Sequence, residues 1–210
     1  MEKVMDGRTV VAVSILVMLG GSTAVQAQGT AEEMWYRDGF WFGFGLGATY
    51  AQIDCSPCGT LLPDDPWEGG LGFGLYLAMG GTLHANLLLG GEINLYGKRN
   101  SSQQRDATLC ALAAVLQYYP WAVSPFYLKG GAGFGGSIMA GGPGLIESGG
   151  WAAQVGLGHD LRVGRRFAVA PFASLVAVVS EGSAGKNQGS PARGPRNPWY
   201  AQFGLGFQWY

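Results

Sequence analysis

Large apolar residues occupy every second position over much of this chain, a spacing typical of β-strands because successive side chains point to opposite faces. The clearest example runs from Phe40 to Ala51, where large apolar residues alternate with mostly small ones. The second face of this strand carries glycine where a soluble sheet would carry charge, as the narrow interior of a barrel would. The same alternation predicts seven further strands, within residues 71–79, 84–96, 107–119, 126–134, 151–162, 167–179 and 199–210.

The segment 107–119 has the weakest strand pattern of the eight. Its run from Ala111 to Leu116 would also suit a buried helix. Pro120 and strand-like neighbours flank it, so we predict a strand with Gln117 facing inward.

The predicted connections alternate in length along the chain. Those near 52–68, 97–106, 137–148 and 180–198 are long and polar, whereas those near 80–82, 120–125 and 164–166 are short. Membrane barrels have short periplasmic turns and longer outer loops. Four long and three short connections therefore predict an all-β fold, an eight-stranded antiparallel up-and-down transmembrane barrel with both chain ends in the periplasm.

Composition supports a membrane barrel. Charged residues make up 13% of the chain, about half the share of an ordinary soluble domain. Residues 1–27 combine Lys3 and Arg8 with an apolar run and the small residues Val25-Gln26-Ala27, which predicts a cleaved signal peptide. We expect residues 28–38 to form a short periplasmic lead and residues 39–210 to form the barrel.

Several glycine- and aromatic-rich motifs resemble those of the small outer-membrane β-barrel superfamily, the OmpA-type transmembrane domains and OmpX-like proteins. They are Gly43-Phe44-Gly45-Leu46-Gly47, Gln117-Tyr118-Tyr119-Pro120, Tyr127-Leu128-Lys129-Gly130-Gly131 and Gly156-Leu157-Gly158-His159-Asp160-Leu161-Arg162. The resemblance implies the outer membrane of a Gram-negative-type bacterium. It also implies contact with outer-membrane lipids, and with the barrel assembly machinery and periplasmic chaperones during biogenesis. We expect a monomer.

The end of the last predicted strand departs from that family's pattern. Members commonly end in an aromatic residue in phase with the lipid-facing row. Here Phe207 and Trp209 lie in that row, and Tyr210 is one residue out of phase. We therefore expect the assembly signal to comprise these three aromatic residues and to centre on Trp209.

The three cysteines fall in two places. Cys55 and Cys58 lie in the first predicted outer loop, and an exported protein meets an oxidising compartment, so a local disulfide is the leading interpretation. Free thiols are the alternative, and a metal site would need two further ligands. We expect Cys110 to be a small buried residue near the outer end of the fourth strand.

No motif supports catalysis, a cofactor or nucleic-acid binding. The sequence from Gly131 to Gly136 spells a dinucleotide fingerprint, but the residues after it cannot open the helix that this motif requires. Neither His84 nor His159 has a nucleophile to activate near the outer leaflet, and no Gly-x-Ser-x-Gly occurs. The formal net charge of −1 offers no basic excess for a nucleic acid.

Inward polar residues are the candidate functional site. Strand direction places five of them near the periplasmic end of the lumen: His84, Gln117, Lys129, Asp160 and Arg162. Because unpaired charge in a narrow interior is costly, we predict that Lys129 pairs with Asp160, with Arg162 alongside. The cluster would be a structural plug or, alternatively, a constriction that filters solutes. Glu92 should lie higher in the lumen, with no partner that the sequence identifies.

The interior of an eight-stranded barrel is just wide enough for side chains to fill. We therefore expect a non-enzymatic envelope protein that stabilises the membrane or presents loops for adhesion. The alternative is a narrow, porin-like channel for small solutes, because many inward positions are glycine. A lipid-modifying outer-membrane enzyme is a more distant alternative.

Overall fold

The computed structural model describes most of the expected barrel. Its described residues are 37–54, 70–100, 105–121, 125–141, 144–180, 184–187, 190–193 and 196–210. The expected signal peptide, most of the expected periplasmic lead, and Cys55 and Cys58 lie outside these residues.

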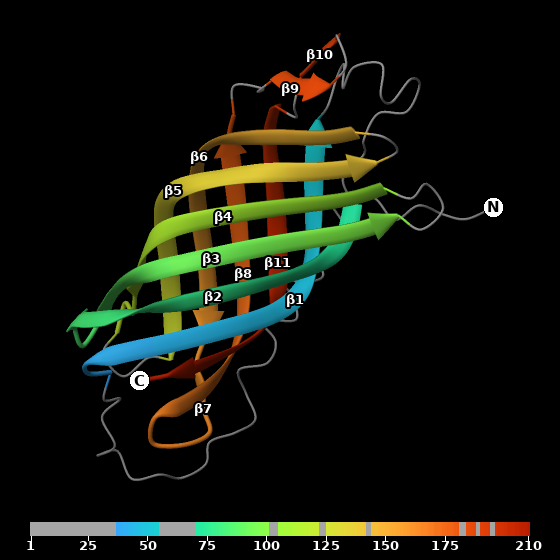
Figure 1. The fold of residues 1–210 in the computed structure, drawn as a ribbon. Coiled ribbons are helices and arrows are strands. Elements are labelled where there is room, and N and C mark those ends of the chain that lie inside the picture. Colours follow the sequence, from blue (N-terminus) through green and yellow to red (C-terminus); the bar gives the residue numbers. More distant parts are fainter. Residues whose placement is uncertain are drawn as a thin grey trace. The chain divides into compact units, whose positions relative to one another are not determined.

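Eight long strands form one antiparallel barrel in this part of the chain (Figure 1). They are β1 (Phe40–Asp54), β2 (Gly70–His84), β3 (Leu87–Asn100), β4 (Arg105–Tyr118), β5 (Phe126–Gly141), β6 (Gly144–His159), β8 (Phe167–Val179) and β11 (Arg196–Trp209). Three short strands accompany them: β7 (Leu161–Arg162) pairs with β8, while β9 (Ala184–Asn187) and β10 (Ser190–Arg193) pair with each other.

The barrel closes through its first and last long strands. β1 pairs with β2 on one side and with β11 on the other, and β11 also pairs with β8. Phe42 lies opposite Trp209, so β1 begins at the end of the barrel where β11 finishes. We call this the terminal end; the opposite end, where the connection containing β9 and β10 leaves β8, is the loop end. The predicted eight-stranded architecture is confirmed.

The segment with the weakest pattern is also a strand. β4 pairs with β3 and β5 along its whole length. Ala113, Val115 and Gln117 are buried inside the barrel, while Leu112 and Leu116 are exposed on the outside. No helix among the described residues is long and apolar enough to cross a membrane.

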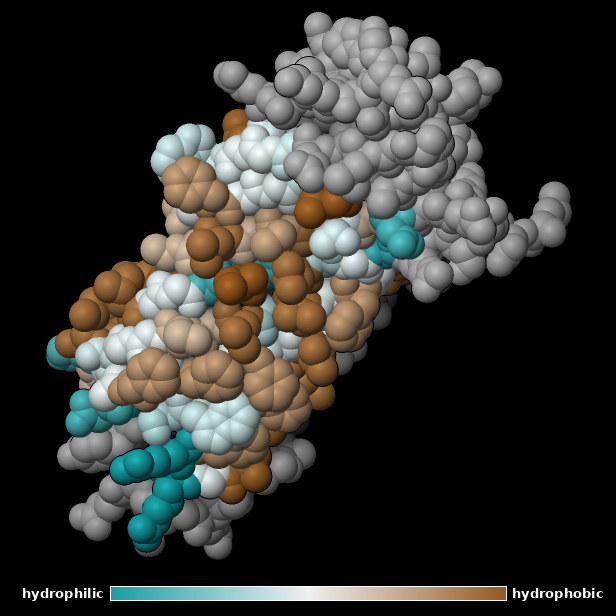
Figure 2. Space-filling model, viewed as in Figure 1, coloured by the Kyte–Doolittle hydropathy of each residue, from teal (hydrophilic) through white to brown (hydrophobic). Residues whose placement is uncertain are grey.

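The outer wall of the barrel is apolar. Large hydrophobic side chains are exposed on all eight long strands, among them Leu46, Leu77, Ile93, Leu112, Phe134, Trp151, Leu175 and Leu205. Figure 2 shows such side chains gathered over the middle of one face, with hydrophilic residues nearer its lower-left and upper-right ends. In water so large an exposed apolar surface would promote association, whereas in a bilayer it faces lipid.

One predicted turn is misplaced. The sequence places it near residues 80–82, but β2 continues to His84 and the turn is formed by Ala85 and Asn86. The glycine at position 80 serves a close approach between strands instead, because a Cβ there would lie 2.1 Å from the carbonyl oxygen of Leu89. Glycine therefore marks tight strand packing at this position and not a chain reversal.

The strands extend further toward the loop end than the sequence pattern predicts. β5 and β6 stay in register up to the pair Gly141 and Gly144, so most of the predicted loop at 137–148 is strand. Inside this extension the hydroxyls of Ser137 and Ser148 lie 2.6 Å apart in a hydrogen bond. The polar residues of this hairpin suggest a loop in the sequence, but they continue the β-ladder between β5 and β6.

Candidate functional site

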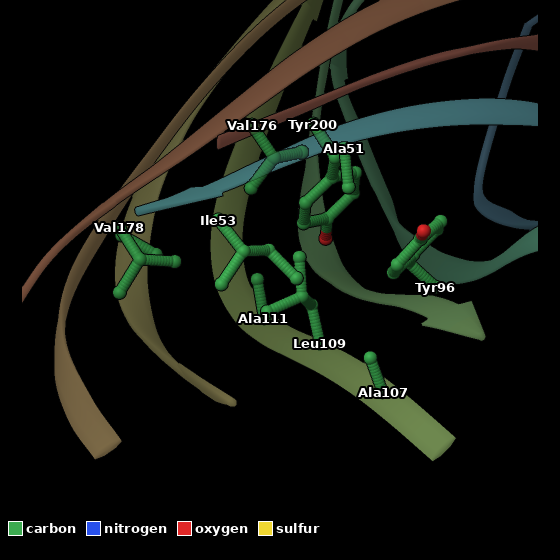
Figure 3. Packing of buried hydrophobic residues seen from close by; sticks show 10 residues of the cluster. Ala51, Ile53, Tyr96, Ala107, Leu109, Ala111, Val176, Val178 and Tyr200 are labelled. Carbon is green, nitrogen blue, oxygen red and sulfur yellow. The ribbon is translucent and has the colours of Figure 1, made fainter. Parts of the chain in front are cut away.

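Two clusters of buried apolar side chains lie inside the barrel. A loop-end cluster of buried apolar residues comprises Ala51, Ile53, Tyr96, Ala107, Leu109, Ala111, Ala152, Val176, Val178 and Tyr200 (Figure 3). A terminal-end cluster comprises Trp41, Tyr76, Ala78, Leu88, Ala113, Val115, Tyr119, Tyr127, Ala170 and Phe172. Two groups of buried polar side chains form the candidate site. One lies between the two apolar clusters, and the other lies at the terminal end.

The first group, the central polar belt, surrounds an ion pair. Its members are Thr49, Glu92, Asn94, Lys129, Gln154, Ser174 and Gln202, all buried. Lys129 Nζ donates to Glu92 Oε1 and Oε2 at 2.7 and 2.8 Å, and the side chains are only 6% and 1% exposed. Asn94 Nδ2 donates to Glu92 Oε1 at 2.9 Å and to Gln154 Oε1 at 2.8 Å. The Lys129 ammonium also lies 4.7 Å from the centre of the Tyr76 ring.

The second group, the terminal latch, comprises Arg37, Gln117, Tyr119, Asp160, Gln208 and Tyr210. Oδ2 of Asp160 is its centre: Arg37 Nη2 lies 3.8 Å away, and the hydroxyls of Tyr119 and Tyr210 donate to it at 2.8 and 2.6 Å. The Arg37 guanidinium lies 3.3 Å from the centre of the Tyr119 ring, a cation–π contact. The latch thus joins the residues just before β1 to the ends of β4, β6 and β11.

The predicted ion pair between Lys129 and Asp160 is wrong. Phe126 pairs with His159, so Asp160 lies beyond the start of β5, opposite Pro125, whose carbonyl oxygen accepts from the Asp160 amide at 2.8 Å. Lys129 is three residues into β5 and points toward the middle of the barrel. The neighbouring position on β6 is Gly156, which leaves room for the lysine side chain. Glu92, for which the sequence offered no partner, is therefore the partner of Lys129.

Two other members of the predicted cluster are not among the buried polar residues. His84 is exposed beside the turn at residues 85 and 86, because β2 runs further than predicted. Arg162 lies on β7, where its guanidinium donates to the carbonyl oxygens of Gly164 and Arg165 at 3.0 and 2.8 Å and so braces the turn before β8. Gln117, Lys129 and Asp160 are buried inside the barrel, but Lys129 belongs to the central belt and the other two to the latch.

Sequence reasoning missed Arg37, Tyr119 and Tyr210. Arg37 was assigned to the lead before the barrel, and nothing in the local pattern marks it as inward. The phase of Tyr210 was a usable signal: one residue after the outward Trp209, it must point inward, and it does. Phe207 and Trp209 lie on the outer wall as predicted, where they contact Phe44, with ring centres 5.0 and 5.9 Å away.

Cys110 is exposed on the outer wall of β4, which contradicts the expectation that it is buried. Its outward phase follows from the alternation that places Leu109 and Ala111 inside. Within the ranges that the structure describes, no group of His, Cys, Asp or Glu could hold a metal ion.

Solved structures share this fold. No protein-family model and no curated protein matches the chain. The crystal structure of Neisserial surface protein A aligns with a TM-score of 0.57 at 15% sequence identity, covering 82% of this chain and 97% of that chain. The crystal structure of Ail, the attachment invasion locus protein of Yersinia pestis, aligns with a TM-score of 0.50 at 12% identity, covering 82% and 99%. The chain has the fold of the small outer-membrane β-barrels.

Proposed function

We propose that this chain is a closed, non-conducting and non-enzymatic barrel of the outer membrane that holds its loop-end connections at the cell surface. The filled interior is the observation that carries the proposal. Trp41, Tyr96, Tyr119, Phe172 and Tyr200 are fully buried and come from five strands or strand ends at different heights. With the Glu92–Lys129 ion pair between them, they leave no level of the barrel without large inward side chains.

The outer wall and the sequence support the location. Exposed leucine, isoleucine and aromatic side chains surround the barrel, as contact with lipid requires. The signal peptide at residues 1–27 would bring the chain across the inner membrane. The outward aromatic residues Phe207 and Trp209 at the end of β11 would serve the assembly machinery, and periplasmic chaperones would escort the unfolded chain. We propose that the barrel functions as a monomer.

Loop presentation is the role that this arrangement favours. The connections after β1, β3, β5 and β8 all leave the loop end, and the terminal end carries the short turn at residues 85 and 86. One solved structure with this fold is that of Ail, the attachment invasion locus protein of Yersinia pestis. A rigid barrel with a sealed interior would hold such connections in place without itself acting on a substrate.

A narrow channel remains the second candidate because the central belt is polar on several strands. The apolar clusters on both sides of the belt argue against it, since a permeant ion would have to pass the buried rings of Tyr96 and Tyr200 as well as the latch. Catalysis has less support: His84 and His159 both lie at the terminal end, away from the loop-end connections.

Conductance in planar lipid bilayers tests the proposal. We expect the refolded full-length protein to give no discrete single-channel openings in about 1 M KCl when a potential on the order of 100 mV is applied. That potential supplies a driving force of roughly 2.3 kcal/mol per elementary charge. Reproducible openings that change when Lys129 is replaced by Met would contradict a sealed interior and support the channel.

A further inference from the structure

The central belt contains an arc of polar side chains that the ion pair does not use. Thr49 on β1 lies opposite Gln202 on β11, and Gln202 lies opposite Ser174 on β8. Their exposed fractions are 0%, 1% and 6%. Thr49 Oγ1, Ser174 Oγ and both polar atoms of the Gln202 side chain have no hydrogen-bond partner among the residues that the structure describes.

Two further members of the belt, on β3 and β6, repeat this feature. Asn94 and Gln154 use one polar atom each in the network around Glu92, while Asn94 Oδ1 and Gln154 Nε2 have no partner within the described ranges. Within the described ranges, unpartnered donors and acceptors of the belt therefore occur on β3 and β6 as well as on the three strands of the arc. These unpartnered atoms include amide donors and oxygen acceptors, so they could bind a ligand that accepts and donates hydrogen bonds.

Aromatic residues bound the belt above and below. Toward the loop end, the rings of Tyr96 and Tyr200 are stacked, with centres 6.3 Å apart. Toward the terminal end, Tyr76 and Phe172 meet edge to face, with centres 4.8 Å apart. The polar atoms of the belt thus lie between two pairs of aromatic side chains and, being buried, are out of contact with bulk water.

Buried polar atoms are destabilising unless they are hydrogen-bonded to protein groups or to ordered water. A buried water typically needs two to four polar partners. Beside Ser174 the inward position on β6 is Gly156, and beside Thr49 the inward position on β2 is Gly72, so neither neighbouring strand supplies a polar side chain at these positions. The Lys129 side chain passes over Gly156, because a Cβ at that glycine would lie 3.2 Å from Ser174 Cβ and 3.4 Å from Lys129 Cε, and the ion pair therefore adjoins the arc.

We propose that the arc of Thr49, Ser174 and Gln202 is a built site for ordered water molecules, which link it to Asn94, Gln154 and the Glu92–Lys129 pair. Water is the ligand that fits, because single molecules can donate to Thr49, Ser174 and Asn94 and accept from the Gln202 and Gln154 amides. This site is independent of the proposed function, since trapped water is compatible with a closed barrel and with a narrow channel alike.

The sign of a stability change tests the proposal. If the arc is dry, Thr49→Val removes an unsatisfied hydroxyl and the urea midpoint of unfolding in lipid vesicles stays the same or rises. If the arc binds water, the same variant deprives the water of a partner, and we expect the midpoint to fall. Thr108→Val is the matched control, because Thr108 is exposed on the outer wall of β4; its midpoint should not fall.

A second measurement detects the water directly. In bilayers, we expect NMR magnetisation to transfer from water to the side-chain amide of Gln202, and to fall at least several-fold in the Thr49→Val/Ser174→Ala double variant. The indole of Trp209, which faces lipid, is the internal control. Absence of transfer to Gln202 in the unmodified protein would overturn the proposal. So would a midpoint that depends on whether Na⁺, K⁺ or choline is present at constant ionic strength, because a cation would then be the ligand.

Discussion

Two buried ion pairs among the described residues of the interior differ in how their charges are balanced. In the central belt, Lys129 and Glu92 make two direct contacts of 2.7 and 2.8 Å between β5 and β3. In the latch, Arg37 and Asp160 are 3.8 Å apart, and two tyrosine hydroxyls and an aromatic ring complete their surroundings. The central pair is held by direct contact between the ammonium and the carboxylate. In the latch, hydrogen bonds from tyrosine hydroxyls to Asp160 stabilise the carboxylate in addition to the more distant guanidinium.

The difference also concerns which parts of the chain are joined. Glu92 and Lys129 lie on strands separated only by β4, so neighbouring strands already hold them near each other. Arg37, Asp160 and Tyr210 come from the start, the middle and the end of the barrel, and meet only once β1 and β11 have closed it. The central pair therefore stabilises the wall, and the latch stabilises closure.

The largest effect should come from breaking the central pair. Glu92→Gln keeps the size of the side chain but leaves the Lys129 ammonium buried without a counter-charge, which costs about 3–5 kcal/mol when one partner of a buried pair is removed. We expect the free energy of unfolding in lipid vesicles, measured by urea titration, to fall by that amount.

A second substitution distinguishes lost charge balance from lost packing. In Glu92→Gln/Lys129→Met no charge remains to be neutralised, so most of the lost stability should return. If the double variant were as unstable as Glu92→Gln, the charge argument would be wrong and the shape of the side chains would be the cause.

A smaller effect is expected when the latch loses its charge. In Asp160→Asn the amide oxygen still accepts from Tyr119 and Tyr210, and Arg37 keeps its contact with the Tyr119 ring. Because hydrogen bonds to charged groups contribute about 1.5–3 kcal/mol and the neutral ones remain, we expect unfolding to become easier by about 1–2 kcal/mol. The measurement is the same urea titration, and a loss equal to that of Glu92→Gln would remove the distinction between the two pairs.

How far the sequence predicts this arrangement depends on whether a feature is local. The phase of each strand is set by adjacent residues, so the alternation correctly places Glu92 and Gln117 inside and Trp209 outside. It fails where glycine has two uses: Gly80 suggested a turn but allows two strands to approach closely. Cys110 shows a different failure, because its burial was assumed from residue type although its phase points outward.

Which inward residues meet is not a local property. Lys129 and Asp160 lie on neighbouring strands, but the register places Asp160 beyond the start of β5, and the side chain that reaches Lys129 comes from β3. That choice depends on strand tilt and on small residues such as Ala113, which is opposite Glu92 on the intervening strand. Arg37 precedes the first strand and has no periodic signal at all.

The smallest effect should follow from removing one hydroxyl of the latch. Tyr210→Phe keeps the ring but deletes the group that contacts Asp160, Tyr119 and Gln208. A single hydrogen bond contributes about 1 kcal/mol net, and the hydroxyl of Tyr119 still donates to Asp160. We therefore expect a barrel that folds and keeps its heat-modifiable migration on gels, but unfolds about 1 kcal/mol more easily in urea. Tyr118→Phe is the matched control, because Tyr118 is exposed on the outer wall one residue before Tyr119. An equal loss in both variants would mean that tyrosine hydroxyls act through the membrane interface and not through the latch, and the contrast between the two ion pairs would then rest on Asp160 alone.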